Sequence, residues 1–122
     1  MLAVAEHYEI ESEYLPRSAT GFCSGLSRTA GTCGALNGGI LAIGLIRGRQ
    51  APGAPVDDCY KAVQDFVTQF EETFTSSNCA VLTGCHLGTP EGQAAFRENQ
   101  VIEKCLGFVE TATKVVLDVL DE

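Results

Sequence analysis

The strongest constraint on the fold is an apolar segment, residues 33–46, that carries glycine at positions where a helix usually excludes it. Gly34, Gly38 and Ala42 recur one helical turn apart, although each interior glycine costs a helix about 1 kcal/mol relative to alanine. We therefore expect the face with Gly34 and Gly38 to pack closely against another backbone or a cofactor. The segment is too short to span a bilayer, so it predicts a buried core helix that ends at Gly48.

A cysteine stands at the start of this helix. Thr32 is a suitable N-cap, because its hydroxyl can accept a free backbone N–H, and Cys33 then takes the first helical position. The positive end of the helix dipole favours a thiolate there, with a pKa below that of a free cysteine. Asn78 and Cys79 repeat this context before a short apolar turn. The two thiols predict a redox pair or part of a metal site; the alternative is that both are small buried side chains.

The rest of the chain also follows helical patterns. Apolar periodicity and the start signal Thr89-Pro90-Glu91 predict an all-α fold, a compact single-domain bundle of about five helices over residues 1–122. The main expected helices cover residues 2–8, 13–23, 33–46, 57–75 and 100–120, with a glycine-containing loop over 21–31. The expected apolar stripes are Val56, Tyr60, Val63, Val67, Phe70 and Phe74 in one long helix, and Ile102, Cys105, Val109, Ala112, Val116 and Val119 in the other.

Charge and composition exclude several classes of partner. The net charge is −8 and the eight basic residues form no cluster, so we expect neither nucleic acid nor an anionic membrane as a partner. No segment predicts membrane insertion. The N-terminal sequence lacks the basic region of a secretory signal, and we therefore expect a cytoplasmic protein. In that reducing compartment, six cysteines indicate metal binding or catalysis more than structural disulfides.

The other cysteines allow several roles. Cys105 and Cys59 lie on apolar helix faces, where core packing is the common role of a cysteine. Cys23 lies in the glycine-containing loop, from which it either reaches a site or fills a gap. Cys85 follows Cys79 by six positions and precedes a histidine, so this segment offers further ligands, but the chain has no standard zinc spacing.

Residues 33–38, CGALNG, resemble the motif of a redox-active protein family named for the pattern C…GCAxxG…C…C. The resemblance covers most of the chain: residues 21–31 are similar to the glycine-rich approach and 38–48 to the core helix. Cys79 and Cys105 fall at the expected third and fourth cysteines. The family's first cysteine, expected in the first helix, has no counterpart before Cys23. We expect that Met1 lies inside that helix, so that truncation removed the cysteine, and that Cys23 is the only stand-in.

The resemblance implies a small cytoplasmic protein with a redox or metal-centred role. The candidate site residues are Cys33, Cys79 and Cys105 for catalysis or metal binding, and Gly34, Gly38, Cys85 and Cys23 for cofactor contact. The implied chemistry is thiol–disulfide exchange, or an iron–sulfur cluster or other thiophilic metal centre held by thiolates. The expected partner is a redox protein, with a homodimer as an alternative assembly. The alternative function is a non-enzymatic helical interaction module with buried reduced cysteines.

Overall fold

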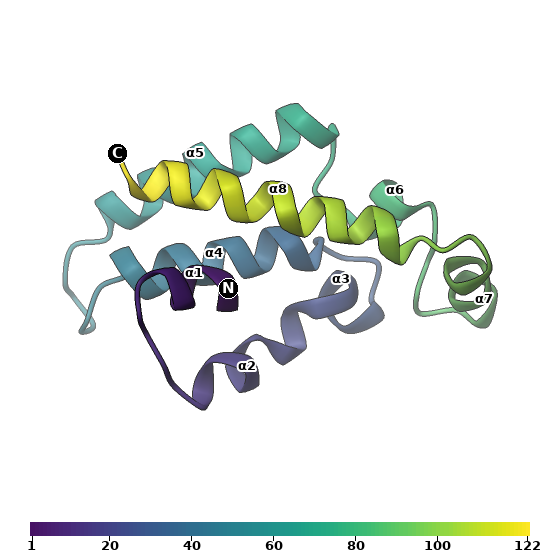
Figure 1. The fold of residues 1–122 in the computed structure, drawn as a ribbon, viewed down its shortest axis with the longest axis horizontal. Coiled ribbons are helices and arrows are strands. Elements are labelled where there is room, and N and C mark those ends of the chain that lie inside the picture. The colour runs from purple at the N-terminus through teal and green to yellow at the C-terminus, as the bar shows by residue number, and fades with distance from the viewer.

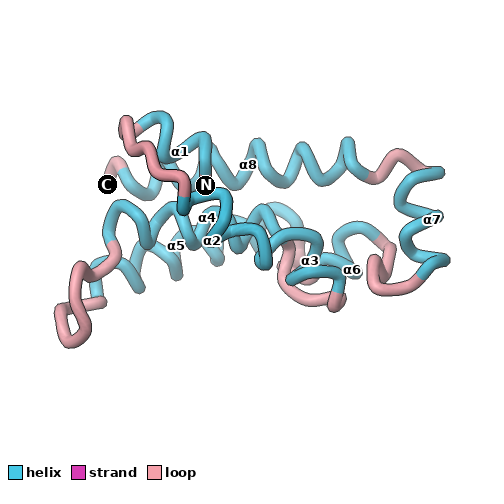
Figure 2. The backbone as a smooth tube through the Cα atoms, turned by 90° about the horizontal axis from the view of Figure 1, so that it is seen from below, coloured by secondary structure: helices cyan, strands magenta, loops and turns pink.

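All regular secondary structure in the computed structural model, which describes residues 1–122, is helical (Figures 1 and 2). The elements are α1 (Leu2–His7), α2 (Tyr14–Ala19), the 3-10 turn η1 (Thr20–Phe22), α3 (Cys23–Arg28), α4 (Gly34–Arg47), α5 (Asp57–Phe74), α6 (Cys79–Thr83), α7 (Pro90–Glu98) and α8 (Ile102–Leu120). This confirms the predicted all-α fold. Four of the helical segments are short, with five or six residues each: α1, α2, α3 and α6. None of the helices has both the length and the apolar character needed to cross a lipid bilayer.

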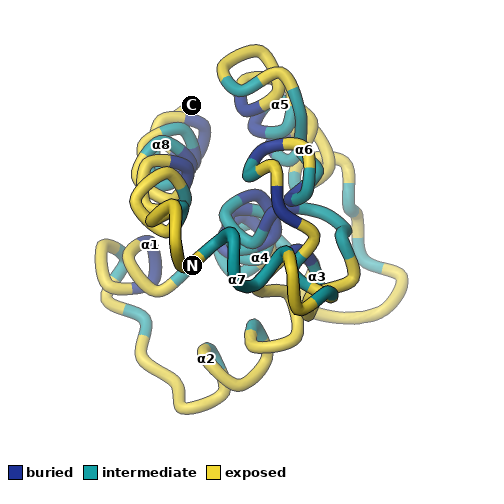
Figure 3. Tube along the Cα trace, turned by 90° about the vertical axis from the view of Figure 1, so that its right-hand side faces the viewer, coloured by how far each residue is buried: buried dark blue, intermediate teal, exposed yellow.

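Three long helices, α4, α5 and α8, run side by side and form the core (Figures 1 and 3). Their buried faces turn toward one another in the end-on view of Figure 3, while α2 and the loop before it remain exposed. Ile43 of α4, Phe66 and Phe70 of α5, and Val116 and Val119 of α8 are completely buried. Because α4 contacts α1 and α3 as well as the other two long helices, it is apolar on almost every side.

A row of aromatic rings joins α5 to α8. Phe66, Phe70 and Phe74 lie edge to face along α5, with ring centroids 6.2 and 4.9 Å apart. Phe74 then meets Phe108 of α8 at 4.9 Å. Each such pair contributes about 0.5–1.5 kcal/mol beyond the burial of its surface, so the row fixes the relative position of the two helices.

The predicted apolar stripes are wrong at three positions. Tyr60 on α5 is 58% exposed, and Ile102 and Val109 on α8 are 53% and 49% exposed. Phe108 was not part of the predicted stripe, but its side chain is the one that enters the core from this part of α8. Ile102 and Val109 line a cavity instead, because the first turns of α8 lie beside the segments that carry Cys33 and Cys79.

The chain between α2 and α4 takes a conformation that the sequence analysis did not anticipate. The helix expected over 13–23 ends at Ala19, continues as the 3-10 turn η1, and then turns left-handed. Residues 24–28 all have positive φ values, between 53° and 69°, and only Gly25 among them is a glycine. A left-handed conformation costs a non-glycine residue about 1–2 kcal/mol. The hydroxyl of Ser27, which donates to the Gly21 carbonyl at 2.8 Å, is one contact that holds the turn.

The close approach predicted for the glycine face of α4 holds for Gly34 but not for Gly38. A Cβ at Gly34 would lie 3.3 Å from the Cα of Cys23, so two backbones meet there. A Cβ at Gly38 would make only an ordinary contact, at 3.6 Å, because this residue borders a cavity. The tightest position of α4 is Gly39, where a Cβ would overlap the ring of Phe66.

We predict that Gly39→Ala lowers the free energy of unfolding by about 1–3 kcal/mol, because the added methyl group overpacks the contact with Phe66. The matched control is Gly44→Ala in the same helix, where nothing lies within 4 Å of the added group. This change should raise the free energy of unfolding by up to about 1 kcal/mol through helix propensity. Urea denaturation measures both, and equal stabilisation by the two variants would contradict the packing described here.

Candidate functional site

Two cysteine-bearing loops are joined by a short antiparallel bridge. Thr32 pairs with Asn78, the Cys33 N–H donates to the Ser77 carbonyl at 2.7 Å, and the Cys79 N–H donates to the Gly31 carbonyl at 2.8 Å. Each cysteine directly follows a bridged residue, so the same two hydrogen bonds hold both cysteine backbones. The starts of α4 and α6 are thereby fixed beside one another.

Asn78 makes the bridge rigid. Its Oδ1 accepts from the Val81 N–H at 3.1 Å, which confirms the predicted cap of α6, and its Nδ2 donates to the Ala30 carbonyl at 2.7 Å. The predicted cap of α4 is wrong: Cys33 itself is the N-cap, and Thr32 is paired with Asn78 instead. Thr32 cannot take the cap position, because the bridge holds it one residue outside the helix.

The left-handed turn lies directly against the thiols. A Cβ at Gly25 would be 2.6 Å from the Cβ of Cys79 and 3.0 Å from its Sγ. The contact with Cys79 therefore requires a glycine at position 25, and glycine also adopts the positive φ of 62° without strain. Asn37, a buried polar residue of α4, holds the chain on both sides of the turn. Its Nδ2 donates to the carbonyls of Phe22 and Thr32, at 3.0 and 3.2 Å.

Cys33, Cys79 and Cys105 line one cavity of about 280 Å³. We refer to it as the cysteine cavity, and its full lining is Cys23, Ser24, Gly25, Cys33, Gly34, Ala35, Cys79, Thr83, Leu87, Phe96, Ile102, Cys105 and Val109. The three main candidates thus come from α4, α6 and α8. Cys33 and Cys79 are 8% and 7% exposed, and Cys105 is half-buried.

The other candidates divide into three groups. Cys23 and Gly34 also line the cysteine cavity, and Cys23 is exposed. Gly38 borders only the neighbouring cavities. Cys85 is buried beside the cluster with its Sγ 3.6 Å from the Thr83 carbonyl oxygen, but it is not part of the cavity wall. Cys59, which was expected in the core, packs against the core cluster.

Burial and mutual repulsion keep two of the thiols protonated. Burial raises the pKa of the Cys79 thiol, and the neighbouring Cys33 adds to the rise, while a hydrogen bond with Thr83 opposes it. Burial also raises the pKa of Cys105, with further contributions from Cys33, Cys79 and Cys85. For Cys79 this direction is opposite to the one expected at a helix start. The helix α6 has five residues, and its dipole is too weak to compensate for lost solvation.

A metal centre requires several ligand side chains that converge on one point. No three histidine, cysteine, aspartate or glutamate side chains are grouped so that they could hold one metal ion. His86 is exposed, and its Nδ1 accepts from the Gly88 N–H at 3.0 Å. The residues present therefore do not fit a cluster or ion bound by Cys33, Cys79 and Cys105. The cavity offers thiols that can react with one another or with a small molecule.

Sequence reasoning missed several residues that build this site. Gly25 and Asn37 position the loops, and Ile102 and Val109 form the apolar wall next to the thiols. One signal was available: Asn37 is the single amide side chain within the apolar segment 33–46, and a polar residue in a buried helix needs hydrogen-bond partners.

We predict that Asn78→Ala lowers the free energy of unfolding by about 1–2 kcal/mol and speeds alkylation of Cys79, because the cap of α6 and the bond to Ala30 are both lost. Thr89→Ala is the matched control, since it removes the cap that Thr89 gives to Gly92 at the start of α7. Thr89→Ala should lower the free energy of unfolding by a similar amount but leave the rate of Cys79 alkylation unchanged. Urea denaturation and mass spectrometry measure these effects, and an equal rise in the Cys79 rate in both variants would refute a local role for Asn78.

Comparison with known proteins agrees with the motif. Searches among curated proteins and among solved structures find no match. The sequence does match a protein family described as "Putative redox-active protein (C_GCAxxG_C_C)" over residues 1–119, almost the whole chain. The chain therefore belongs to the C_GCAxxG_C_C family of redox-active proteins.

Proposed function

We propose that this chain is a thiol–disulfide redox protein in which Cys33, Cys79 and Cys105 carry the reaction. The observation that supports this role is that these three thiols, from three different helices, line one cavity. A structural cysteine packs among apolar side chains, as Cys59 does. Three thiols around a common hollow are arranged for chemistry with one another or with a bound molecule.

Cys33 is the common partner in this proposal. Among the neighbouring thiols, Cys33 contributes most to the raised pKa of Cys79 and to the raised pKa of Cys105. Cys33 therefore influences the ionisation of both thiols. A disulfide from Cys33 to either residue would form by loss of two electrons and two protons to an acceptor disulfide, which is reduced to two thiols. It would also remove the repulsion between the thiolates.

The raised pKa values set the working conditions of such a pair. Cys79 and Cys105 are protonated at neutral pH, so their thiolate fraction and their exchange rates rise as the pH increases. In a reducing compartment such as the cytoplasm, the resting form would be the dithiol. Because the side chains do not fit a metal ion, thiol–disulfide exchange is favoured over a metal centre.

We predict that oxidation of the reduced protein with bis(2-hydroxyethyl) disulfide forms an intramolecular disulfide from Cys33 to Cys79 or Cys105. Peptide mapping by mass spectrometry identifies the pair. Cys59→Ser is the control and should leave the pairing unchanged, because Cys59 packs against the core. Cys33→Ser should abolish both pairings.

The alternative, an interaction module with buried reduced cysteines, predicts a different result. All six cysteines would then remain free in the oxidising buffer as long as the chain is folded. Disulfides that join Cys23 between two molecules and leave the cysteine cavity reduced would also contradict the proposal, since Cys23 is the exposed thiol.

A further inference from the structure

The cysteine cavity borders a second apolar cavity. This second hollow, of about 390 Å³, lies between α1, α2, η1, α4 and α8. Both cavities include Cys23, Gly34 and Val109 in their walls, so they meet at these residues. Pockets of several hundred Å³ that are mainly apolar are the usual binding sites of small molecules. A molecule in the second cavity would lie next to Cys23 and at the boundary with the cysteine cavity.

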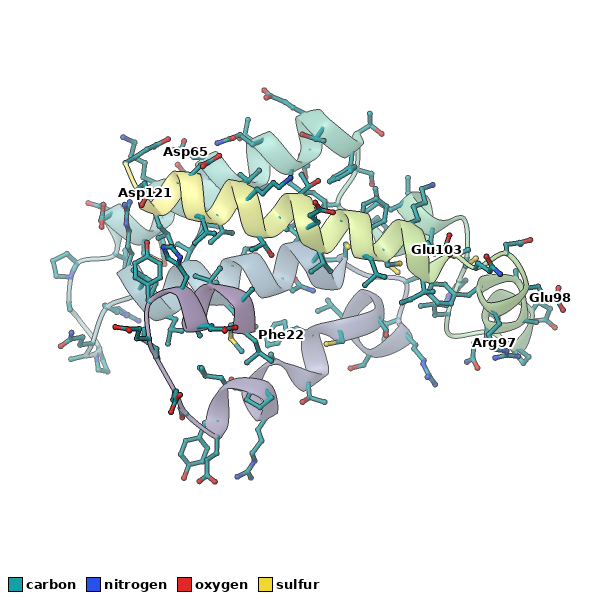
Figure 4. All side chains as sticks on the ribbon, in the orientation of Figure 1. Phe22, Asp65, Arg97, Glu98, Glu103 and Asp121 are labelled. Atoms are coloured by element: carbon teal, nitrogen blue, oxygen red, sulfur yellow. The ribbon has the colours of Figure 1, made fainter.

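The walls of both cavities carry no charged side chain. The lining of the second cavity includes Leu2, Phe22 and Leu41, and the first has Phe96 and Ile102. Figure 4 shows Phe22 on the α2 side of the molecule, away from the labelled charged side chains, which lie on α5, at the two ends of α8 and on α7. The N-terminal amine of Met1 belongs to the wall of the second cavity, where burial lowers its pKa and so favours its neutral form. No charged side chain in either wall would compensate a ligand charge for its loss of water.

Three of the four hydroxyl groups in the walls donate within the protein, and Ser24 of the cysteine cavity is the fourth. Thr20 and Thr113 of the second cavity donate to the carbonyls of Pro16 and Val109, at 2.6 and 2.9 Å. Thr83 of the cysteine cavity donates to the Cys79 carbonyl at 2.7 Å. These protons are not available to bind an anion, and the net charge of −8 repels anions at longer range.

We propose that the two cavities together bind an uncharged, apolar disulfide and deliver it to the cysteine cluster. This inference deepens the proposed function and rests on it. One thiolate of the cavity attacks the bound disulfide RSSR, which forms a protein–SR mixed disulfide and releases one thiolate that is protonated to RSH. A second cavity thiol loses its proton and attacks the protein sulfur of the mixed disulfide, which releases the second RSH. Two cysteine thiols are oxidised to a disulfide and one RSSR is reduced to two RSH.

The experiment compares two disulfides with similar primary alkyl leaving groups, dipropyl disulfide and the dianionic 3,3′-dithiodipropionate. Loss of protein thiols is followed for the folded reduced chain and for the same chain unfolded in guanidinium chloride. The ratio of the two rates in the unfolded chain is the intrinsic reference. We expect folding to shift this ratio about tenfold toward dipropyl disulfide, because only the folded chain buries the propyl groups.

Salt and a pair of matched variants separate the cavity from the surface. At about 0.5 M salt the repulsion by surface charge is screened, but the preference of the cavity should persist. Val109→Lys puts a cation where the cavities meet and should remove most of the shift. Leu106→Lys, an exposed position of the same helix outside both cavities, should leave it unchanged.

The possible failures are distinguishable. If neither disulfide produces an intramolecular disulfide in the folded chain, the proposed function fails and this inference fails with it. If both produce it with the rate ratio of the unfolded chain, thiol–disulfide exchange stands but the apolar site is refuted. A preference that disappears at high salt, or that Val109→Lys leaves intact, also refutes the apolar site.

Discussion

The antiparallel bridge between Thr32 and Asn78 is the interaction on which the site depends. Neither α4 nor α6 could bring a thiol into the cavity alone, because the first is a core helix and the second has only five residues. The hydrogen bonds from the Cys33 and Cys79 N–H groups make the two helix starts one unit. Each bond contributes only about 0.5–1.5 kcal/mol, but each also satisfies a buried backbone group that would otherwise be costly.

The second feature that shapes the site is the left-handed turn over residues 24–28, in which Gly25 contacts Cys79. Its strain is offset by hydrogen bonds from Ser27 and from the buried Asn37. Strained backbone that persists next to reactive groups is a common property of functional sites. Ser24 and Gly25 of the turn belong to the wall of the cysteine cavity, and the partly exposed Ile102 and Val109 form an apolar part of the same wall. No charged side chain belongs to this wall.

Much of the fold could be predicted from local sequence patterns, since the periodic residues of α5 and α8 and the caps at Asn78 and Thr89 act over one helical turn. The left-handed turn could not, because four of its five residues normally avoid positive φ. The candidate thiols were recognisable from their helix starts and from the family motif. The bridge between Thr32 and Asn78 could not be recognised, because it joins residues far apart in the sequence. This bridge also holds Thr32 outside the predicted cap position of α4. The raised pKa of Cys79 also depends on burial, which no local pattern specifies.

The most direct test of this account is amide hydrogen exchange of the Cys33 and Cys79 N–H groups in the reduced protein. Both groups donate across the same bridge, to Ser77 and Gly31 respectively. If the bridge is the unit that holds the site, both amides are protected and exchange with the same opening free energy, and Asn78→Ala lowers the two values together. Protection of the Cys33 amide with a freely exchanging Cys79 amide would show that the two loops open independently, and would contradict the account.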